Sequence, residues 1–119
     1  MNPNILELKT YVPTKNFEES KQFYSELGFT LTEAWGGNVD CKLGGAQFRL
    51  QNYYNKDWAE NFMMQFWVED VQAWYDFAKP IIESGRHSNV RISEPELVGG
   101  DTKIMHIWDP CGVLLIFIE

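Results

Sequence analysis

The sequence has none of the patterns typical of a disulfide framework, a membrane span or a secretion signal. Its two cysteines, Cys41 and Cys111, form neither a CxxC pair nor a metal-type cluster. Two reduced thiols are therefore expected rather than a disulfide framework. No apolar run approaches the length of a membrane span, and Met1 to Leu8 lacks the basic start and long apolar stretch of a signal peptide. We expect a cytoplasmic protein with no membrane partner.

Basic residues are also scarce. Lys and Arg number 10 against 17 Asp and Glu, which gives a net charge of −7 at pH 7. Nucleic acids are held by clustered Lys and Arg, so a nucleic-acid partner is not expected. A cationic ligand is compatible with this charge, although acidity also serves solubility. The 119 residues, 45% of them hydrophobic, are enough for a core within a single domain.

Catalytic motifs are missing as well. The sequence has no GxSxG, and Gly44-Gly45 and Gly99-Gly100 are typical of turns rather than of a phosphate-binding loop. His87 and His106 lie outside any HxxxH, HExxH or paired-carboxylate context, so we expect both to be structural or exposed. Glu7 and Lys9 are expected to form a salt bridge rather than an acid–base pair. No catalytic residue is predicted.

An internal repeat is the most informative feature that is present. When the second half is placed on the first, Asp70 falls on Asn16 and Phe77 on Phe23. Asn and Asp cap helices, and apolar residues at steps of three and four then give one buried stripe. Two copies are too few for a solenoid. The repeat therefore predicts two modules related by a pseudo-twofold, with a cleft where they meet.

Hydrophobic periodicity predicts an α+β fold of two βαβββ modules, residues 1–51 and 62–119, joined by a linker over 52–61. The first module is expected to contain a helix and four strands: a half-buried strand from Leu6 to Val12, a helix from Phe17 to Leu27, and strands over Phe29 to Trp35, Val39 to Leu43 and Ala46 to Gln51. The second is expected to contain a strand over Phe62 to Val68, a helix from Val71, and strands over Thr102 to Trp108 and Val113 to Ile118. Between the second helix and the strand over Thr102 to Trp108, the segment Arg86 to Gly100 is predicted to be irregular. Because Pro80 lacks an amide hydrogen, we expect the second helix to kink or end near Lys79.

Three segments carry a family resemblance: the helix N-F-E-E-S-K-Q-F-Y from Asn16, Leu27-Gly28-Phe29, and W-D-P-C-G-V-L-L-I-F from Trp108. With them the whole chain resembles the vicinal oxygen chelate superfamily of glyoxalase I, extradiol dioxygenases, and fosfomycin- and bleomycin-resistance proteins. Asn61 and Ser93 to Leu97 are similar to the bleomycin-resistance branch. The resemblance implies a curved mixed sheet with a concave cleft, and a homodimer with ligand clefts between its subunits.

Alternation along the strands separates two faces. In Ala46 to Gln51, Phe48 and Leu50 suit helix packing, which leaves Gln47, Arg49 and Gln51 on the other face. The resemblance implies that this second face lines the cleft. Aromatics in loops beside a cleft can stack on a planar ligand, or instead cover core or a subunit interface. The candidate ligand-binding residues are Lys9, Trp35, Arg49, Gln51, Tyr54, Met63, Gln65, Trp67 and Ile116.

Metal-dependent members of the superfamily carry a His, Gln or Glu at one cleft position in each of four strands. The matching residues here are Lys9, Gln51, Met63 and Ile116, of which only Gln51 can ligate a hard divalent ion. We therefore expect no metal and no cofactor. The predicted function is a metal-free binder of the bleomycin-resistance type that sequesters a cationic, aromatic small molecule such as an antibiotic. A metal-dependent glyoxalase- or dioxygenase-like enzyme with non-standard ligands, and a scaffold whose cleft is closed by its own aromatics, remain alternatives.

Overall fold

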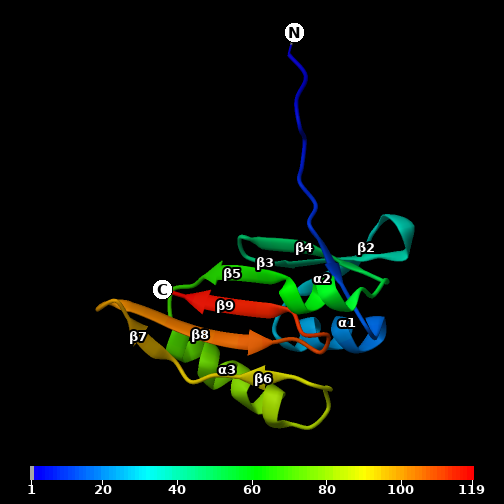
Figure 1. Ribbon diagram of the computed structural model, residues 1–119. Coiled ribbons are helices and arrows are strands. Elements are labelled where there is room, and N and C mark those ends of the chain that lie inside the picture. Colours follow the sequence, from blue (N-terminus) through cyan, green and yellow to red (C-terminus); the bar gives the residue numbers. More distant parts are fainter. Residues whose placement is uncertain (1) are drawn as a thin grey trace.

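The computed structural model describes residues 2–119, which form two mixed sheets and the helices that back them (Figure 1). The first sheet has the order β1-β4-β3-β2, with β1 (Tyr11–Pro13), β2 (Thr30–Glu33), β3 (Val39–Leu43) and β4 (Ala46–Gln51). The second has the order β5-β9-β8-β6, with β5 (Met63–Trp67), β6 (Arg91–Ile92), β8 (Thr102–Trp108) and β9 (Leu114–Ile118), and with β7 (Glu96–Val98) paired to β8. In each sheet the first strand runs parallel to the last, β1 to β4 and β5 to β9. The α+β prediction is confirmed.

The two long helices begin where the repeat predicts. Helix α1 (Phe17–Glu26) starts after Asn16, whose side chain accepts a hydrogen bond from the amide of Glu19. Helix α3 (Val71–Glu83) starts after Asp70, which caps the amide of Ala73 in the same way. The predicted linker contains a further short helix, α2 (Lys56–Asn61). None of the helices within residues 2–119 has both the length and the apolar character needed to cross a bilayer.

Helix α3 does not end near Lys79, so that part of the prediction is wrong. Pro80 lies inside the helix, which runs on to Glu83 and is closed by Ser84. Pro removes one hydrogen bond from a helix. Ile82, on the last turn, is buried in the core, and this burial offsets the lost bond. The segment predicted to be irregular also contains two short strands, β6 and β7.

The core lies between the helices and one face of each sheet. Phe48 and Leu50 of β4 are buried, whereas Arg49 and Gln51 between and beside them are partly exposed. The ring of Phe48 meets that of Tyr24 from α1 edge-on, with 5.0 Å between centroids. The alternation predicted for this strand is therefore confirmed. Both cysteines are free and buried, and burial raises the pKa of the Cys41 thiol to about 12.

A buried polar cluster ties α1 to the turn that precedes β9. The hydroxyl of Tyr24 donates to Oδ2 of Asp109 over 2.7 Å, and both residues are fully buried. The other oxygen of Asp109 accepts from the amides of Cys111 (2.9 Å) and Val113 (3.0 Å). Desolvation raises the pKa of both Asp109 and Tyr24. Three donors therefore converge on one carboxyl group, which holds the turn against the first helix.

The N-terminal segment departs most from the sequence-based prediction. The strand expected from Leu6 to Val12 is confined to Tyr11–Pro13, which pairs with β4 from Arg49 to Gln51. Residues 2–10 continue as an extended arm that leaves the body of the protein (Figure 1). Leu6 is 94% exposed and Leu8 is 83% exposed. The prediction that they form part of a half-buried strand is wrong for the single chain.

A surface cluster joins the ends of the two long helices. The carboxylate of Glu26, the last residue of α1, accepts from the guanidinium of Arg86 and lies 2.8 Å from Nε2 of His87. His87 is buried and touches the ring of Phe23, as expected for a structural histidine. Desolvation alone raises the pKa of Glu26, but the bonds from Arg86 and His87 outweigh it, so this pKa lies below its usual value of 4.5.

We expect Glu26 to contribute to stability near neutral pH and to lose that contribution in acid. A carboxyl group whose pKa is lowered by folding stabilises the protein above its unfolded-state pKa and stops doing so as the pH falls through the folded-state pKa. The free energy of unfolding should therefore fall as the pH drops below about 4.5. When the free energy of unfolding is measured with urea across this pH range, it should depend less on pH in Glu26→Gln than in the wild-type protein. The exposed Glu33→Gln serves as the control, and identical profiles for wild type and Glu26→Gln would contradict the expectation.

Candidate functional site

Helices α1 and α3 pack on only one face of each sheet, so the opposite face is left uncovered; we call it the bare face. The burial pattern of the strands assigns residues to it, because buried and partly exposed positions alternate. On the first sheet it carries mainly polar side chains, those of Asp40, Lys42, Gln47, Arg49 and Gln51. On the second sheet it carries mainly apolar and aromatic ones, those of Met63, Gln65, Trp67, His106, Trp108, Leu114 and Ile116.

The polar half of the bare face is organised around Asp40. Its Oδ1 accepts from Nε of Arg49 over 2.8 Å, and its Oδ2 accepts from Nζ of Lys9 over 3.1 Å. Lys9 also pairs with Glu7 over 2.7 Å, so the salt bridge predicted between them is confirmed. The hydrogen bonds from Arg49 and Lys9 hold the pKa of Asp40 below its usual range, while Glu7 and Asp40 raise the pKa of Lys9. Two cations thus face two carboxylates, so the charges within this network balance.

The side chain of Arg49 is held by hydrogen bonds within this network. Besides Asp40, its guanidinium donates to the hydroxyl of Tyr11 over 3.3 Å and lies 5.5 Å from the centre of that ring. A guanidinium held this way has a raised pKa and remains a cation. Arg49 therefore presents a fixed, neutralised plane to the bare face rather than a free anion-binding group.

The apolar half is more open. Met63 is 60% exposed and Trp67 is 71% exposed. The indole nitrogen of Trp67 donates to the side-chain oxygen of Gln65 over 2.9 Å, which fixes both side chains on the same side of β5. At the far side of this half, the guanidinium of Arg91 lies 4.0 Å from the ring centre of Trp108. Aromatic and aliphatic surface with a few oriented polar groups is what small-molecule sites use.

Most of the predicted site residues lie on or beside the bare face, from both halves: Lys9, Arg49, Gln51, Met63, Gln65, Trp67 and Ile116. Two do not. Trp35 lies in the 3-10 turn η1 (Trp35–Gly37) after β2 and is 80% exposed. Tyr54 packs partly against the core near Lys15 and lines a hollow with Pro110 and Gly112, apart from this face.

Asp40 and Trp108 belong to the bare face but were not among the sequence candidates. The signal for both is the same period-two alternation that identified Arg49. Val39 and Cys41 are buried, so Asp40 between them must face outward. Met105 and Ile107 are likewise buried, which places His106 and Trp108 on the other side of β8. The period-two alternation of β3 and β8 therefore predicts the side on which Asp40 and Trp108 lie.

The residues at the four superfamily ligand positions do not fit a hard divalent ion. Lys9 is held as a charged ammonium by Glu7 and Asp40, and Met63 and Ile116 offer no oxygen or nitrogen donor. Only Gln51 has a suitable atom, its Oε1, which is buried without a hydrogen-bond partner. Elsewhere in residues 2–119, no three His, Cys, Asp or Glu side chains come close enough together to hold a metal.

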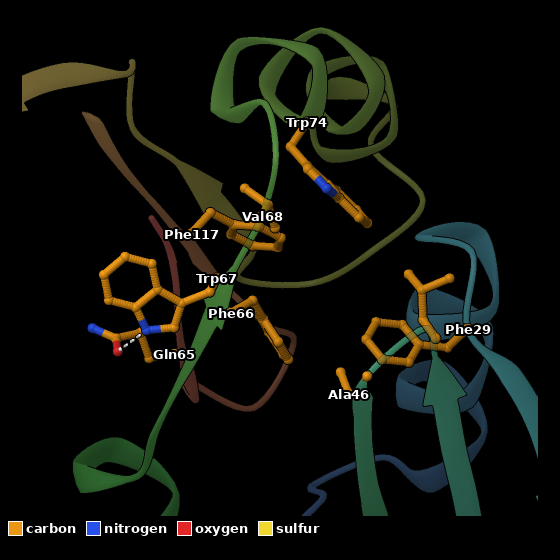
Figure 2. A pocket seen from close by; sticks show the side chains of 10 residues that line it. Phe29, Ala46, Gln65, Phe66, Trp67, Val68, Trp74 and Phe117 are labelled. Atoms are coloured by element: carbon orange, nitrogen blue, oxygen red, sulfur yellow. Dashed lines mark hydrogen bonds between the residues drawn. The ribbon is translucent and has the colours of Figure 1, made fainter. Parts of the chain in front are cut away.

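A cavity of about 310 Å³ lies at the seam between the two sheets. Phe29 and Ala46 line it from the first sheet's side, and Phe66, Val68, Trp74 and Phe117 line it from the other (Figure 2). Figure 2 also shows that Trp67 and Gln65 project from the opposite side of β5 to Phe66. The cavity therefore opens on the helix-facing side of the seam, whereas the predicted ligand-binding residues of β5 face the other way.

Comparisons with known proteins agree with this architecture. Residues 7–117 match the model of the glyoxalase/bleomycin resistance protein/dioxygenase superfamily. A bleomycin resistance determinant encoded on transposon Tn5 has a similar structure, with a TM-score of 0.77 and 23% identity over 95% of this chain and 96% of its own. A bleomycin-binding protein complexed with bleomycin has a TM-score of 0.77 and 22% identity over 95% of this chain and 97% of its own. Lactoylglutathione lyase from Agrobacterium tumefaciens has a TM-score of 0.68 and 14% identity over 98% of this chain and 95% of its own. No curated protein sequence matches the chain.

Proposed function

Because the chain belongs to the glyoxalase/bleomycin resistance protein/dioxygenase superfamily, and its bare face has no set of metal donors, we propose that it is a small-molecule binder that acts by sequestration. The observation that carries this proposal is the composition of the bare face. An exposed apolar and aromatic half adjoins a half in which Lys9 and Arg49 are paired with Asp40. Such a surface can bury and orient a ligand but offers no group that is poised to react with it.

The ligand that suits this surface is aromatic. Trp67 presents flat, exposed aromatic area, and such a ring stacks on planar groups. The net charge of −7 favours a cationic molecule through long-range attraction. The bleomycin-resistance and bleomycin-binding proteins of the same fold support a ligand of this kind, such as an antibiotic. A homodimer that covers part of the bare face belongs to the proposal.

An enzyme is the second candidate, and one observation favours it: the lyase among the proteins of similar fold. It would require a metal held by ligands other than those at the superfamily positions. Elemental analysis of protein purified without chelator separates the two. We expect no stoichiometric zinc, nickel or iron, and one tightly held ion per chain would favour the enzyme.

Replacing Trp67 by alanine is expected to weaken ligand binding by about 1–3 kcal/mol, because a stacked indole and its buried area are lost. Titration calorimetry with bleomycin and with ethidium, a planar aromatic cation, provides the measurement. Trp35→Ala removes a similarly exposed indole away from the bare face and should leave both affinities unchanged. Failure of both probes to bind the wild-type protein, or equal losses in the two variants, would count against the proposed site.

A further inference from the structure

The cavity on the helix-facing side of the seam is walled by a continuous series of aromatic rings (Figure 2). Ring centroids of Phe29 and Phe66 lie 6.1 Å apart, those of Phe66 and Phe117 lie 5.2 Å apart, and those of Phe117 and Trp74 lie 5.0 Å apart. The series begins in the first module and continues in the second, so it crosses the seam. It presents flat apolar surface to whatever enters the cavity.

The lining of this cavity is uncharged. Among residues 2–119, none of those that line it is an acid, a lysine, an arginine or a histidine. A charged molecule taken into it would lose its hydration without gaining a partner of opposite charge. The volume of about 310 Å³ is at the lower end of the range for small-molecule sites, about 300–1,000 Å³. These properties favour a neutral molecule of one or two fused rings.

Strand β5 adds polar backbone groups to the apolar lining. Gln65 and Trp67 line the cavity although their side chains project from the other side of the strand, so they reach it through their backbone (Figure 2). The amide of Val68 donates to the carbonyl of Ile118 on β9 over 2.9 Å. Because successive residues of a strand direct their N–H and C=O groups to opposite edges, those of Gln65 and Trp67 point away from β9.

These outward groups have no strand to pair with. Within residues 2–119, β5 is the terminal strand of its sheet, and β9 is its one strand partner. The carbonyl of Gln65 and the amide of Trp67 are consecutive groups on the free edge, an acceptor followed by a donor. Both require a hydrogen bond once water is displaced from the cavity. A molecule with a donor beside an acceptor can pair with the two groups at once.

We propose that the seam cavity is a second binding site, which takes a neutral, planar heteroaromatic molecule with a ring N–H next to a ring carbonyl, as in a lactam. The ligand N–H would donate to the carbonyl of Gln65, and the ligand carbonyl would accept from the amide of Trp67. The ligand rings would pack among Phe66, Phe117 and Trp74. This site goes beyond the proposed function and does not depend on it, since it lies on the other side of β5 from the bare face.

An extended peptide is the other kind of molecule that a free strand edge accepts. A peptide needs a long run of edge and separate pockets for alternate side chains. The cavity of rings meets β5 only at its end, from Gln65 to Trp67. Its position therefore favours a compact molecule over a strand.

Chemical-shift titration of nitrogen-15-labelled protein with carbostyril, a neutral bicyclic lactam, tests the site. We expect saturable binding that shifts the backbone amide of Trp67 and the indole of Trp74 but not the indole of Trp35. N-methylcarbostyril keeps the rings and the carbonyl but lacks the donor, so it should bind about 3- to 10-fold more weakly. An absence of saturable binding by carbostyril, or equal affinities for the two lactams, would overturn the site.

Two variants at one position test the backbone contact. Trp67→Pro removes the amide hydrogen that the ligand carbonyl needs, and proline is tolerated on an edge strand where its N–H would face away from the neighbouring strand. Trp67→Ala is the matched control, because it removes the same indole and keeps the amide. We expect carbostyril to bind about 3- to 10-fold more weakly to Trp67→Pro than to Trp67→Ala. Equal affinities in two folded variants would overturn the contact with β5.

A third variant fills the cavity from the opposite wall. Ala46 lines it from β4 and is partly exposed, so Ala46→Phe places a ring in the space without replacing a core residue. We expect this variant to lose carbostyril binding and to keep its circular dichroism spectrum. Gln47→Phe introduces the same ring on the other side of β4 and should bind carbostyril as the wild-type protein does. Undiminished binding by Ala46→Phe would overturn the site.

Parallel titrations with ethidium separate this site from the proposed function. Ethidium should bind Ala46→Phe as it binds the wild-type protein, and loss of both probes in this variant would overturn the existence of a second site. Wild-type protein that binds carbostyril but not ethidium would contradict the proposed function alone. A leucine tripeptide with blocked ends that binds more tightly than carbostyril, and shifts the amide of Met63 as well as that of Trp67, would assign the edge to a peptide and overturn the proposal.

Discussion

Replacing Asp109 by alanine is expected to lower the free energy of unfolding by about 3–5 kcal/mol, because the change leaves three buried donors without an acceptor. These donors are the hydroxyl of Tyr24 and the amides of Cys111 and Val113, at 2.7 to 3.0 Å. Each buried donor left unpaired costs about 1–3 kcal/mol, and the costs overlap because the three share one carboxyl group. Urea denaturation followed by circular dichroism measures this change in the free energy of unfolding.

The matched variant for this cluster is Tyr24→Phe. It removes one of the three hydrogen bonds and keeps the ring that packs against Phe23, Phe29 and Phe48. We expect a loss of about 1–2 kcal/mol, smaller than that of Asp109→Ala. If Tyr24→Phe were as damaging as Asp109→Ala, the ring environment rather than the shared carboxyl group would explain the stability of this cluster.

Replacing Phe48 by alanine should also cost about 3–5 kcal/mol of stability, because a buried ring is removed from a packed core. Phe48 is 2% exposed, and its ring meets those of Tyr24 and Phe29 at centroid distances of 5.0 and 5.3 Å. These neighbours belong to α1 and to the loop after it, so they cannot collapse into the space without moving the helix.

Trp67→Ala is the control for the assignment of the two faces. Trp67 is 71% exposed, so its removal should change the free energy of unfolding by less than about 1 kcal/mol. Thermal unfolding of both variants in parallel provides the comparison. A harmless Phe48→Ala together with an unfolded Trp67→Ala would mean that the bare face and the core-facing side have been exchanged.

Much of the candidate site follows from local pattern. Period-two alternation placed Arg49 and Gln51 opposite Phe48 and Leu50, and the structure has the same arrangement. It also placed Trp67 on the side of β5 opposite Phe66 (Figure 2). Alternation succeeds here because a strand fixes the direction of each successive side chain, and one side of each sheet must meet the helices. The pairing of Glu7 with Lys9 follows for the same reason, since both lie on one side of an extended segment.

Other parts of the site depend on contacts that no local pattern encodes. Tyr54 lies in an aromatic stretch of sequence beside the predicted cleft, yet the chain places it near Lys15, apart from the bare face. Arg49 was expected to be available to a ligand, but Asp40 on the neighbouring strand holds it. Which cation meets which carboxylate is set by strand register, and register is a property of the sheet rather than of either strand alone.

By itself, the sequence determined the α+β class, the duplicated plan, the two capped helix starts at Asn16 and Asp70, and the two faces of β4 and β5. The helix starts and the strand faces follow from residues that are close together in the sequence, and the duplicated plan follows from the similarity of two such local patterns. Only the tertiary structure decided that Tyr24 and Asp109, 85 positions apart, share a buried hydrogen bond, and that the arm before Tyr11 leaves the sheet. Those outcomes depend on which distant segments meet, because a buried donor or a strand edge is satisfied by whatever partner the assembled fold brings to it.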